Sequence, residues 1–328
     1  MRLSLLCCLL ASLLFTAACR KNTTPAPTNP PVLPQPAIIP PINDLGTASW
    51  RGRQGGLYPN GLNTRPVAHQ QAGEAIAQGI RPLDASGAAD ATNGRIVWLA
   101  IGMSNTTQEA SVFINLSNNL HNRHPRLSLV DGAQGGWDID MINNPAALYW
   151  DNVVTRLSQQ GLTPAQVQIV WLKQADRSFP DTSFAGYTAR YRDKLATTIG
   201  IIRSKFPNVK LLYLSSRIYA GYQTGTGSNP EPYACYTGWG VKDLIAEQIN
   251  GNPAYAYAGS GAPMPWLSWA AYTWAHGNRV RGDGLRWLRE DFEPDGIHPS
   301  NSGRRKVAEL LLQFFTTDAT ARPWFVQP

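Results

Sequence analysis

The sequence predicts an α/β fold, a three-layer doubly wound sheet of about five parallel strands with helices on both faces. Five short apolar runs support this prediction, because near-continuous apolar character is typical of strands covered on both faces. Helical patterns separate the runs, and strands that alternate with helices form parallel sheets with right-handed crossovers. Ligands of such sheets bind at the carboxyl ends of the strands, so the chemistry is expected there.

The elements can be placed in chain order. The strands are expected at 95–102, 127–131, 167–172, 209–215 and 264–269. The helices are expected at 107–120, 145–160, 184–206, 241–249 and 302–315. An Asn-Pro pair begins the second helix, and Pro207 ends the third because proline cannot continue a helix.

Two stretches, 45–94 and 219–275, fit the alternation of strands and helices poorly. The second stretch is rich in Gly, Pro and aromatic residues. We expect it to form long loops and one helix, packed over one end of the sheet.

The composition excludes several classes of protein. Of the 328 residues, 43% are hydrophobic and 16% are charged, which allows a large core and excludes wholesale disorder. The net charge is +7, but the basic residues are scattered and form neither a stripe nor a known nucleic-acid motif. We therefore expect no nucleic-acid partner, and collagen-like, coiled-coil and multi-span membrane proteins are excluded as well.

The N-terminus predicts export. Residues 1–18 combine one Arg, an apolar run and small residues, which is typical of a signal peptide. The segment Thr16-Ala17-Ala18-Cys19 resembles a bacterial lipobox, in which the Cys is lipidated and becomes N-terminal after cleavage. Thr16 departs from that pattern, since lipoboxes usually carry Leu there, and ordinary cleavage after an A-x-A-like site is the alternative.

A tether and one folded domain are expected to follow. Residues 19–43 are rich in Pro, Thr and Asn and predict a semi-rigid tether, and residues 44–328 predict the folded domain. Arg20 is not the Asp that retains comparable lipoproteins in the inner membrane. The lipobox resemblance therefore implies a lipoprotein of a bacterial cell envelope, anchored through Cys19 in the outer membrane.

Cysteine usage and motif content predict neither a metal nor a cofactor. Cys7 and Cys8 leave with the signal peptide and Cys19 would carry lipid, so Cys235 remains alone and no internal disulfide is expected. One Cys and five scattered His offer no zinc-binding spacing, and Cys235 is expected to be a small buried residue rather than a nucleophile. The sequence also has no phosphate-binding G-x-x-x-x-G-K-[ST] loop and no G-x-G-x-x-G at a strand–helix junction.

Ser104 follows the first strand, in Gly102-Met103-Ser104-Asn105, directly before a helical pattern. A serine at such a corner exposes its hydroxyl beside the unpaired N–H groups of the helix, where an oxyanion would be stabilised. Capping of the helix by Ser104 is the alternative.

The segment DGIHP at 295–299 stands directly before the last expected helix. His298 could accept the serine's proton while Asp295, three residues earlier, fixes the imidazole tautomer. The alternatives are a turn held by Asp295 and a surface role for His298.

These two segments together resemble the SGNH (GDSL-like) hydrolase superfamily. That family has its nucleophile just after the first strand and D-x-x-H-P before the last helix, and the G-M-S-N of this chain is similar to the G-Q-S-N of its carbohydrate O-acetylesterase branch. The resemblance implies a flavodoxin-like sheet and a serine esterase in which Ser104 is the nucleophile, His298 the general base and Asp295 its orienting carboxylate.

The resemblance also implies an oxyanion hole. Its donors would be the N–H of Ser104, the N–H of Gly136 (with Gly135 as the alternative) and the side-chain amide of Gln174. Gln174 is a departure, because the family usually carries Asn in G-x-N-D at this point and this chain reads L-K-Q-A-D.

The expected substrate is a small acyl ester, acetyl above all, on carbohydrate. Asn105 and Arg217, both at carboxyl strand ends, are the candidate substrate-binding residues, although Arg217 could equally form a structural ion pair. The aromatic rings of 219–275 could stack on sugars or simply pack in the core. A non-catalytic carbohydrate-binding lipoprotein and an O-acyltransferase are the competing functions, since a fold does not fix its substrate.

Overall fold

The structure is a computed structural model that describes residues 38–177, 181–224 and 229–327. The predicted signal peptide, Cys19 and most of the predicted tether lie outside the described residues. The described part begins at Ile38, within the predicted tether. Ile42 is fully buried and the Ile39 N–H donates to His276 Nδ1, so the end of the predicted tether packs on the domain.

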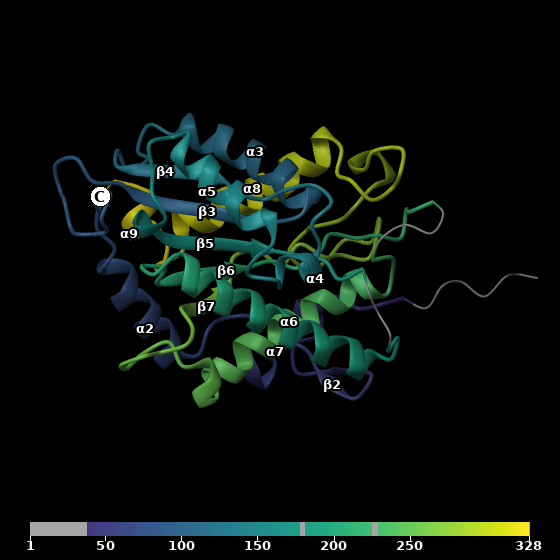
Figure 1. Cartoon of the computed structure of the whole chain (residues 1–328). Coiled ribbons are helices and arrows are strands. Elements are labelled where there is room, and N and C mark those ends of the chain that lie inside the picture. The colour runs from purple at the N-terminus through teal and green to yellow at the C-terminus, as the bar shows by residue number, and fades with distance from the viewer. Residues whose placement is uncertain (1–37, 178–180, 225–228, 328) are drawn as a thin grey trace, which may run out of the picture. The chain divides into compact units, whose positions relative to one another are not determined.

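Five parallel strands form the large sheet, in the order β4-β3-β5-β6-β7 (Figure 1). They are β3 (Ile96–Gly102), β4 (Leu127–Asp131), β5 (Val167–Lys173), β6 (Leu211–Leu214) and β7 (Trp266–Trp269). Numbered along the chain this order is 2-1-3-4-5, the flavodoxin-like order, which confirms the predicted fold class. The order reverses between β3 and β5, and a ligand crevice is expected outside their carboxyl ends.

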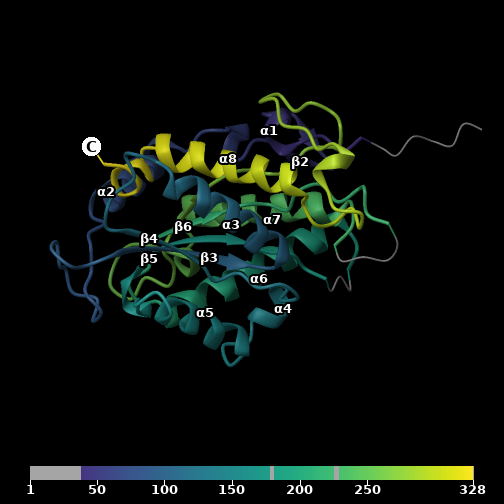
Figure 2. The same cartoon turned by 90° about the horizontal axis from the view of Figure 1, so that it is seen from above.

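Helices cover both faces of this sheet (Figure 2). The longer ones are α2 (Val67–Gln78), α3 (Ser104–Asn118), α5 (Leu148–Ser158), α6 (Phe184–Lys205), α7 (Tyr233–Ile249) and α8 (Asn301–Thr317). The shorter ones are α1 (Ile42–Leu45), α4 (Ile139–Ile142) and α9 (Arg322–Phe325). A two-stranded antiparallel pair, β1 (Ser49–Trp50) and β2 (Arg53–Gln54), precedes the sheet in the chain.

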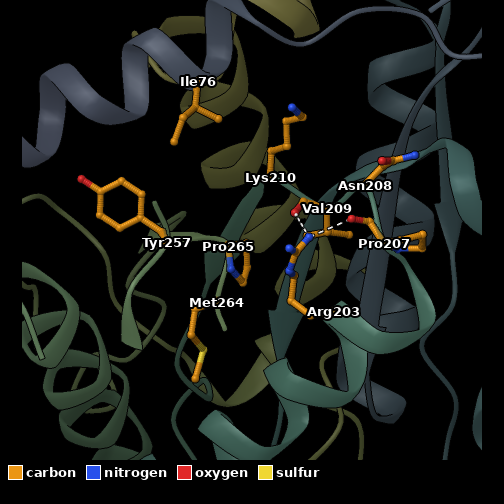
Figure 3. Close-up of a pocket in the computed structure, with 9 residues that line it drawn as sticks. All are labelled: Ile76, Arg203, Pro207, Asn208, Val209, Lys210, Tyr257, Met264 and Pro265. Carbon is orange, nitrogen blue, oxygen red and sulfur yellow. Dashed lines mark hydrogen bonds between the residues drawn. The ribbon is translucent and has the colours of Figure 1, made fainter. Parts of the chain in front are cut away.

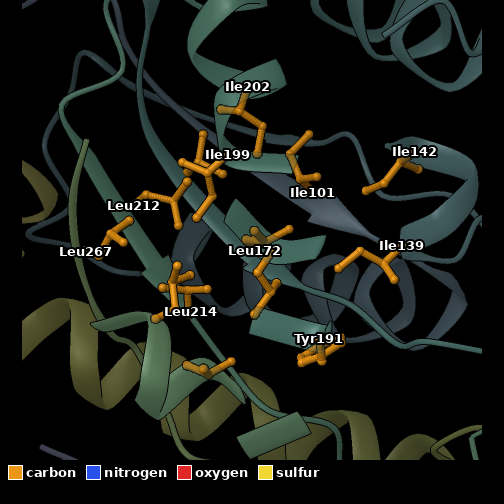
Figure 4. Packing of buried hydrophobic residues seen from close by; sticks show 14 of the residues in the cluster. Ile101, Ile139, Ile142, Leu172, Tyr191, Ile199, Ile202, Leu212, Leu214 and Leu267 are labelled. Atoms are coloured by element: carbon orange, nitrogen blue, oxygen red, sulfur yellow. The ribbon is translucent and has the colours of Figure 1, made fainter. Parts of the chain in front are cut away.

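Two apolar clusters, one on each face, hold the layers together. Along β3, alternate residues belong to alternate clusters: Val97 and Leu99 face α5, α6 and α7, while Trp98 and Ala100 face α2, α3, α8 and α9. This period of two is the ordinary geometry of a strand, and here both directions are apolar because helices cover both faces. Figure 4 shows the first cluster, with strand residues such as Leu172 against Ile199 and Ile202 of α6.

The sequence did not predict α2, and its buried face explains why. That face consists of His69, Gly73 and Ala77, so it lacks the large apolar residues that mark an amphipathic helix. A Cβ on Gly73 would lie 2.3 Å from the Trp266 ring, so the missing side chain lets α2 pack closely on β7.

The aromatic-rich stretch 219–275 belongs mainly to the core. It contains α7 and β7, and α7 packs on a face of the sheet rather than over one end as expected. Trp239, Trp266 and Trp274 are fully buried, and so is Cys235, whose thiol has its pKa raised well above the ordinary value by burial. Within the described ranges, no helix combines the length and the apolar character needed to cross a bilayer.

Candidate active site

Ser104 lies where β3 passes into α3, at the carboxyl edge of the sheet. Gly102 makes this corner possible, because a Cβ there would lie 2.2 Å from the Lys173 carbonyl oxygen of the neighbouring strand. The N-cap position of α3 belongs to Met103, and no side chain caps this helix end. The hydroxyl of Ser104 is therefore not used as a cap.

The structure brings the three predicted triad residues together. Ser104 Oγ lies 2.9 Å from His298 Nε2, and His298 Nδ1 lies 2.5 Å from Asp295 Oδ2. In this arrangement one ring nitrogen faces the hydroxyl and the other faces the carboxylate, as a Ser-His-Asp relay requires. Their assignment as catalytic residues stays a prediction.

The loop that carries Asp295 and His298 is held by its own hydrogen bonds. Asp295 Oδ1 accepts from the backbone N–H groups of Ile297 and His298. Partial burial raises the pKa of Asp295, but the His298 imidazole and these two N–H groups outweigh it and hold the pKa below the ordinary value. Gly296 has a φ of 67°, and a Cβ there would lie 2.0 Å from the Tyr222 carbonyl oxygen, so the loop requires glycine.

A pocket of ≈ 400 Å³ opens beside Ser104 and His298. Loops after β3, β4, β5 and β6 contribute to its wall, as expected for a crevice at the carboxyl ends of parallel strands. Its remaining lining residues are Met103, Asn105, Gly135, Gly136, Trp137, Asp138, Ala175, Arg177, Arg217 and Ile297.

Both candidate oxyanion glycines line this pocket, and Gly135 lies nearer the nucleophile. A Cβ on Gly135 would be 3.7 Å from Ser104 Cβ, whereas a Cβ on Gly136 would meet nothing within 4 Å. The carbonyl of Gly136, which has a φ of 84°, accepts from Arg177. Gly136, the predicted donor, and Gly135, the alternative, thus both stay candidates for the second N–H of an oxyanion hole.

Gln174 is not brought into the pocket. Its side chain is fully buried, and its Nε2 donates to the Trp137 carbonyl oxygen at 3.0 Å. The amide to which the family resemblance gave an oxyanion role thus holds the loop after β4 in place, because Trp137 belongs to that loop. The expected third oxyanion donor is not supplied by Gln174 in this arrangement.

Asn105 lines the pocket but also ties two parts of the site together. Its Nδ2 donates to the Ile297 carbonyl oxygen at 3.0 Å, next to His298. Its Oδ1 is buried and has no hydrogen-bond partner among the described residues. Because the amide group has two N–H donors, the bond to Ile297 leaves one N–H as well as Oδ1 for the predicted substrate-binding role.

A buried ion pair lies beneath the corner that carries Ser104. Lys173 Nζ donates to both carboxylate oxygens of Glu109 at 2.6 Å, and both side chains are fully buried. Burial raises the pKa of Glu109 and lowers that of Lys173, while each charge opposes the shift of its partner. The pair joins α3 to the end of β5, so it fixes the helix that presents the nucleophile.

Several pocket residues were not predicted from the sequence. Apart from the His298 imidazole, Trp137 supplies the one aromatic ring among the lining residues, and none of the rings of 219–275 is among them. Arg177 forms an ion pair with Asp138 at 3.0 Å. For the buried pair of Lys173 and Glu109, the sequence offered one signal, a Lys at the end of an otherwise apolar strand. No local motif predicts that Trp137 or Arg177 lines the pocket.

Among the described residues, no cluster of His, Cys, Asp and Glu could hold a metal ion.

Comparison with known proteins gives similarities to solved structures. No family model and no curated protein matches the chain. A carbohydrate esterase family 3 protein from Talaromyces cellulolyticus is 13% identical, with a TM-score of 0.36, covering 66% of this chain and 94% of that one. A salicylyl-acyltransferase from a tetracycline biosynthetic pathway is 16% identical, with a TM-score of 0.36, covering 68% and 54%. An extracellular lipase from Streptomyces rimosus is 11% identical, with a TM-score of 0.35, covering 66% and 98%.

The fold and the order of its parts agree with the resemblance stated from the sequence. A five-stranded parallel sheet in the order 2-1-3-4-5 carries a serine after its first strand, and an Asp-x-x-His-Pro segment precedes its last long helix. The chain has a three-layer α/β fold with the flavodoxin-like strand order, which is the fold that the resemblance to the SGNH (GDSL-like) hydrolases implies.

Proposed function

We propose that this chain is a serine esterase that hydrolyses small acyl esters through an acyl-enzyme intermediate. The observation that carries the proposal is the line of Ser104 Oγ, His298 and Asp295, with neighbouring atoms 2.9 and 2.5 Å apart. The same line also argues against a non-catalytic binding protein, because such a protein would have no need of this geometry.

In the acylation step, Ser104 Oγ attacks the ester carbonyl carbon while His298 Nε2 accepts its proton. Asp295 holds the Nδ1–H and stabilises the imidazolium that forms. The N–H groups of Ser104 and of Gly136, with Gly135 as the alternative, stabilise the oxyanion, and each such donor typically contributes about 100- to 1000-fold to the rate. The C–O bond then breaks, and His298 returns the proton to the departing alcohol.

In the deacylation step, His298 Nε2 accepts a proton from a water molecule while the oxygen of that water attacks the carbonyl carbon of the acyl-serine. The second tetrahedral intermediate breaks down to the carboxylic acid, and the proton returns to Ser104 Oγ. In an acyltransferase a sugar hydroxyl would take the place of this water.

The proposed substrate is an acetyl or similarly small ester on carbohydrate. The G-M-S-N segment and the exported location predicted for the chain support this choice, and a pocket of ≈ 400 Å³ suits a small ligand. The aromatic rings of 219–275 no longer support it, since most of them are in the core.

We also propose that the protein is exported and anchored to a bacterial outer membrane through lipid on Cys19. The support is the sequence of residues 1–43 alone. Metabolic labelling with a fatty acid should mark the full chain and not the Cys19→Ser variant, and equal labelling of both would contradict the anchor.

A substrate panel tests the esterase function. Nitrophenyl esters of increasing acyl length and acetylated polysaccharides should be offered to the purified folded domain, with Ser104→Ala as the control. We expect release of acetate or nitrophenol by the wild type and none by the variant. Adding a free sugar acceptor separates hydrolysis from transfer, since an acyltransferase would yield acylated sugar. Equal turnover by the Ser104→Ala protein would overturn the proposal.

A further inference from the structure

Arg217 is a buried cation that lines the candidate active-site pocket and has unused hydrogen-bond donors. The residue is 2% exposed and lines the same pocket as Ser104 and His298. Its Nε and Nη2 have no hydrogen-bond partner among the described residues, and its Nη1 meets only Met103 Sδ, at 3.5 Å. Buried guanidinium groups are normally paired, so these orphaned donors need an explanation.

The acidic groups nearest to Arg217 do not satisfy it. Glu109 gives both of its carboxylate oxygens to Lys173. Glu231 accepts from the backbone N–H groups of Ala220 and Cys235 and from the Trp274 indole. These carboxylates offset the charge of Arg217 from a distance, but none of them accepts a hydrogen bond from its buried Nε and Nη2.

A second cavity in the same molecule provides a contrast. It has a volume of ≈ 300 Å³ and lies by the beginning of β6, and Figure 3 shows Arg203 at its wall. The Arg203 guanidinium donates to the carbonyl oxygens of Pro207 and Val209 at 2.8 and 3.2 Å. The Arg203 guanidinium thus has backbone acceptors, whereas Nε and Nη2 of Arg217 have no acceptor among the described residues.

The two free nitrogens of Arg217 also have a definite geometry. Nε–H and one N–H of Nη2 lie on the same edge of the planar guanidinium and point in parallel, which matches the two oxygens of a carboxylate. Arg177 also lines the pocket, but its charge is balanced by the ion pair with Asp138, so the attraction of an anion depends on Arg217.

We propose that the ester substrate carries a carboxylate that binds side-on to Arg217 while Ser104 attacks its acyl group. The inference rests on the proposed esterase function and specifies its substrate class: an acylated acid, such as a sugar acid, rather than a neutral ester. Arg217 is then the residue that determines specificity.

Isosteric ester pairs test this assignment. The probes are 4-acetoxybenzoate with 4-acetoxybenzamide, and 3-acetoxybenzoate with 3-acetoxybenzamide, in which the acetyl group is constant and only the charge changes. The wild type should show a kcat/KM about 10- to 100-fold higher for the benzoate of at least one pair, because hydrogen bonds to charged groups discriminate by that order. Arg217→Met should remove most of this preference, and Arg217→Lys should keep part of it.

Two controls separate charge from folding. Arg81→Met removes an exposed arginine near the start of β5, at the other edge of the sheet, and should leave the preference intact. Competitive inhibition of the wild type by benzoate, compared with benzamide, needs no variant and should favour benzoate.

The outcomes are distinct. Hydrolysis of both members of each pair at equal kcat/KM by the wild type would overturn the carboxylate assignment and leave the esterase proposal standing. An equal loss for both members in Arg217→Met would also overturn it, since that result indicates an oxyanion or structural role. No hydrolysis of any ester would overturn the esterase proposal and the inference with it.

Discussion

The side-chain amide of Asn105 donates to the carbonyl oxygen of Ile297 at 3.0 Å and so joins the helix that carries Ser104 to the loop that carries His298. The two residues lie far apart in the sequence, and each is adjacent to a member of the proposed triad. This contact therefore controls the distance between nucleophile and base. Asn105 is a positioning residue in this respect.

Asn105→Ala should lower kcat about 10-fold with a smaller change in KM, because the loop loses one hydrogen bond and His298 loses its fixed position. Steady-state kinetics on a nitrophenyl ester measure both constants. Asn119→Ala, at the exposed end of the same helix, is the matched control and should behave as the wild type. Wild-type kcat in the Asn105→Ala protein would contradict the positioning role.

Asp295→Asn should keep the loop but impair the base. An amide oxygen can still accept from the backbone N–H groups of Ile297 and His298, while the negative charge that stabilises the imidazolium is lost. In Ser-His-Asp triads this change typically lowers kcat by about 10⁴-fold. A thermal unfolding curve close to the wild type, together with this loss of turnover, is the expected result. Turnover within a few-fold of the wild type would remove Asp295 from the proposed mechanism.

The buried pair of Glu109 and Lys173 should respond differently to single and double replacement. Glu109→Leu alone leaves the Lys173 ammonium buried without a partner and should destabilise the fold by about 3–5 kcal/mol. Combining Glu109→Leu with Lys173→Met removes both charges and should recover most of that loss. Urea unfolding of the three proteins measures the difference. A double variant as unstable as the single one would show that the pair is needed for more than charge balance.

Asp131 predicts a pH dependence of stability. This carboxyl lies at the end of β4, where burial raises its pKa to about 6 despite hydrogen bonds from Thr107 and the Ala133 N–H. A raised folded-state pKa gives stability that is fully present below the unfolded pKa and is lost as the pH rises through the folded one. Relative to Asp131→Asn, the wild type should lose about 1 kcal/mol of unfolding free energy between about pH 5 and about pH 7.5. A difference that is independent of pH, or one of opposite sign, would contradict the burial of an ionising carboxyl here.

The sequence was most informative where a local pattern and the tertiary fold agree. The five strands are continuous apolar runs, and the structure places each within two residues of its expected bounds because a buried strand needs apolar side chains on both faces. The strand–helix corner at Ser104 and the DGIHP segment could also be identified from the local sequence. Each contains a glycine, Gly102 or Gly296, that a close backbone contact in the fold requires.

The remaining features depend on contacts that no local pattern carries. The sequence pattern did not predict helix α2, because this helix packs on Trp266 through Gly73 and has no stripe of large apolar residues. Gln174 has the donor that a motif comparison asks for, but the chain uses it on the Trp137 carbonyl. Arg217 could be noted as lying at a strand end, yet only the structure shows that its buried Nε and Nη2 have no partner among the described residues.

Mass spectrometry of the protein after reaction with a fluorophosphonate tests the central claim most directly. The reagent phosphonylates a serine whose proton is removed by a neighbouring base, so the peptide that contains Ser104 should carry one phosphonyl group in the wild type. Labelling should disappear in Ser104→Ala and become far slower in His298→Ala. An unlabelled Ser104 in a protein that still hydrolyses esters, or equal labelling rates with and without the His298 imidazole, would contradict the proposed triad.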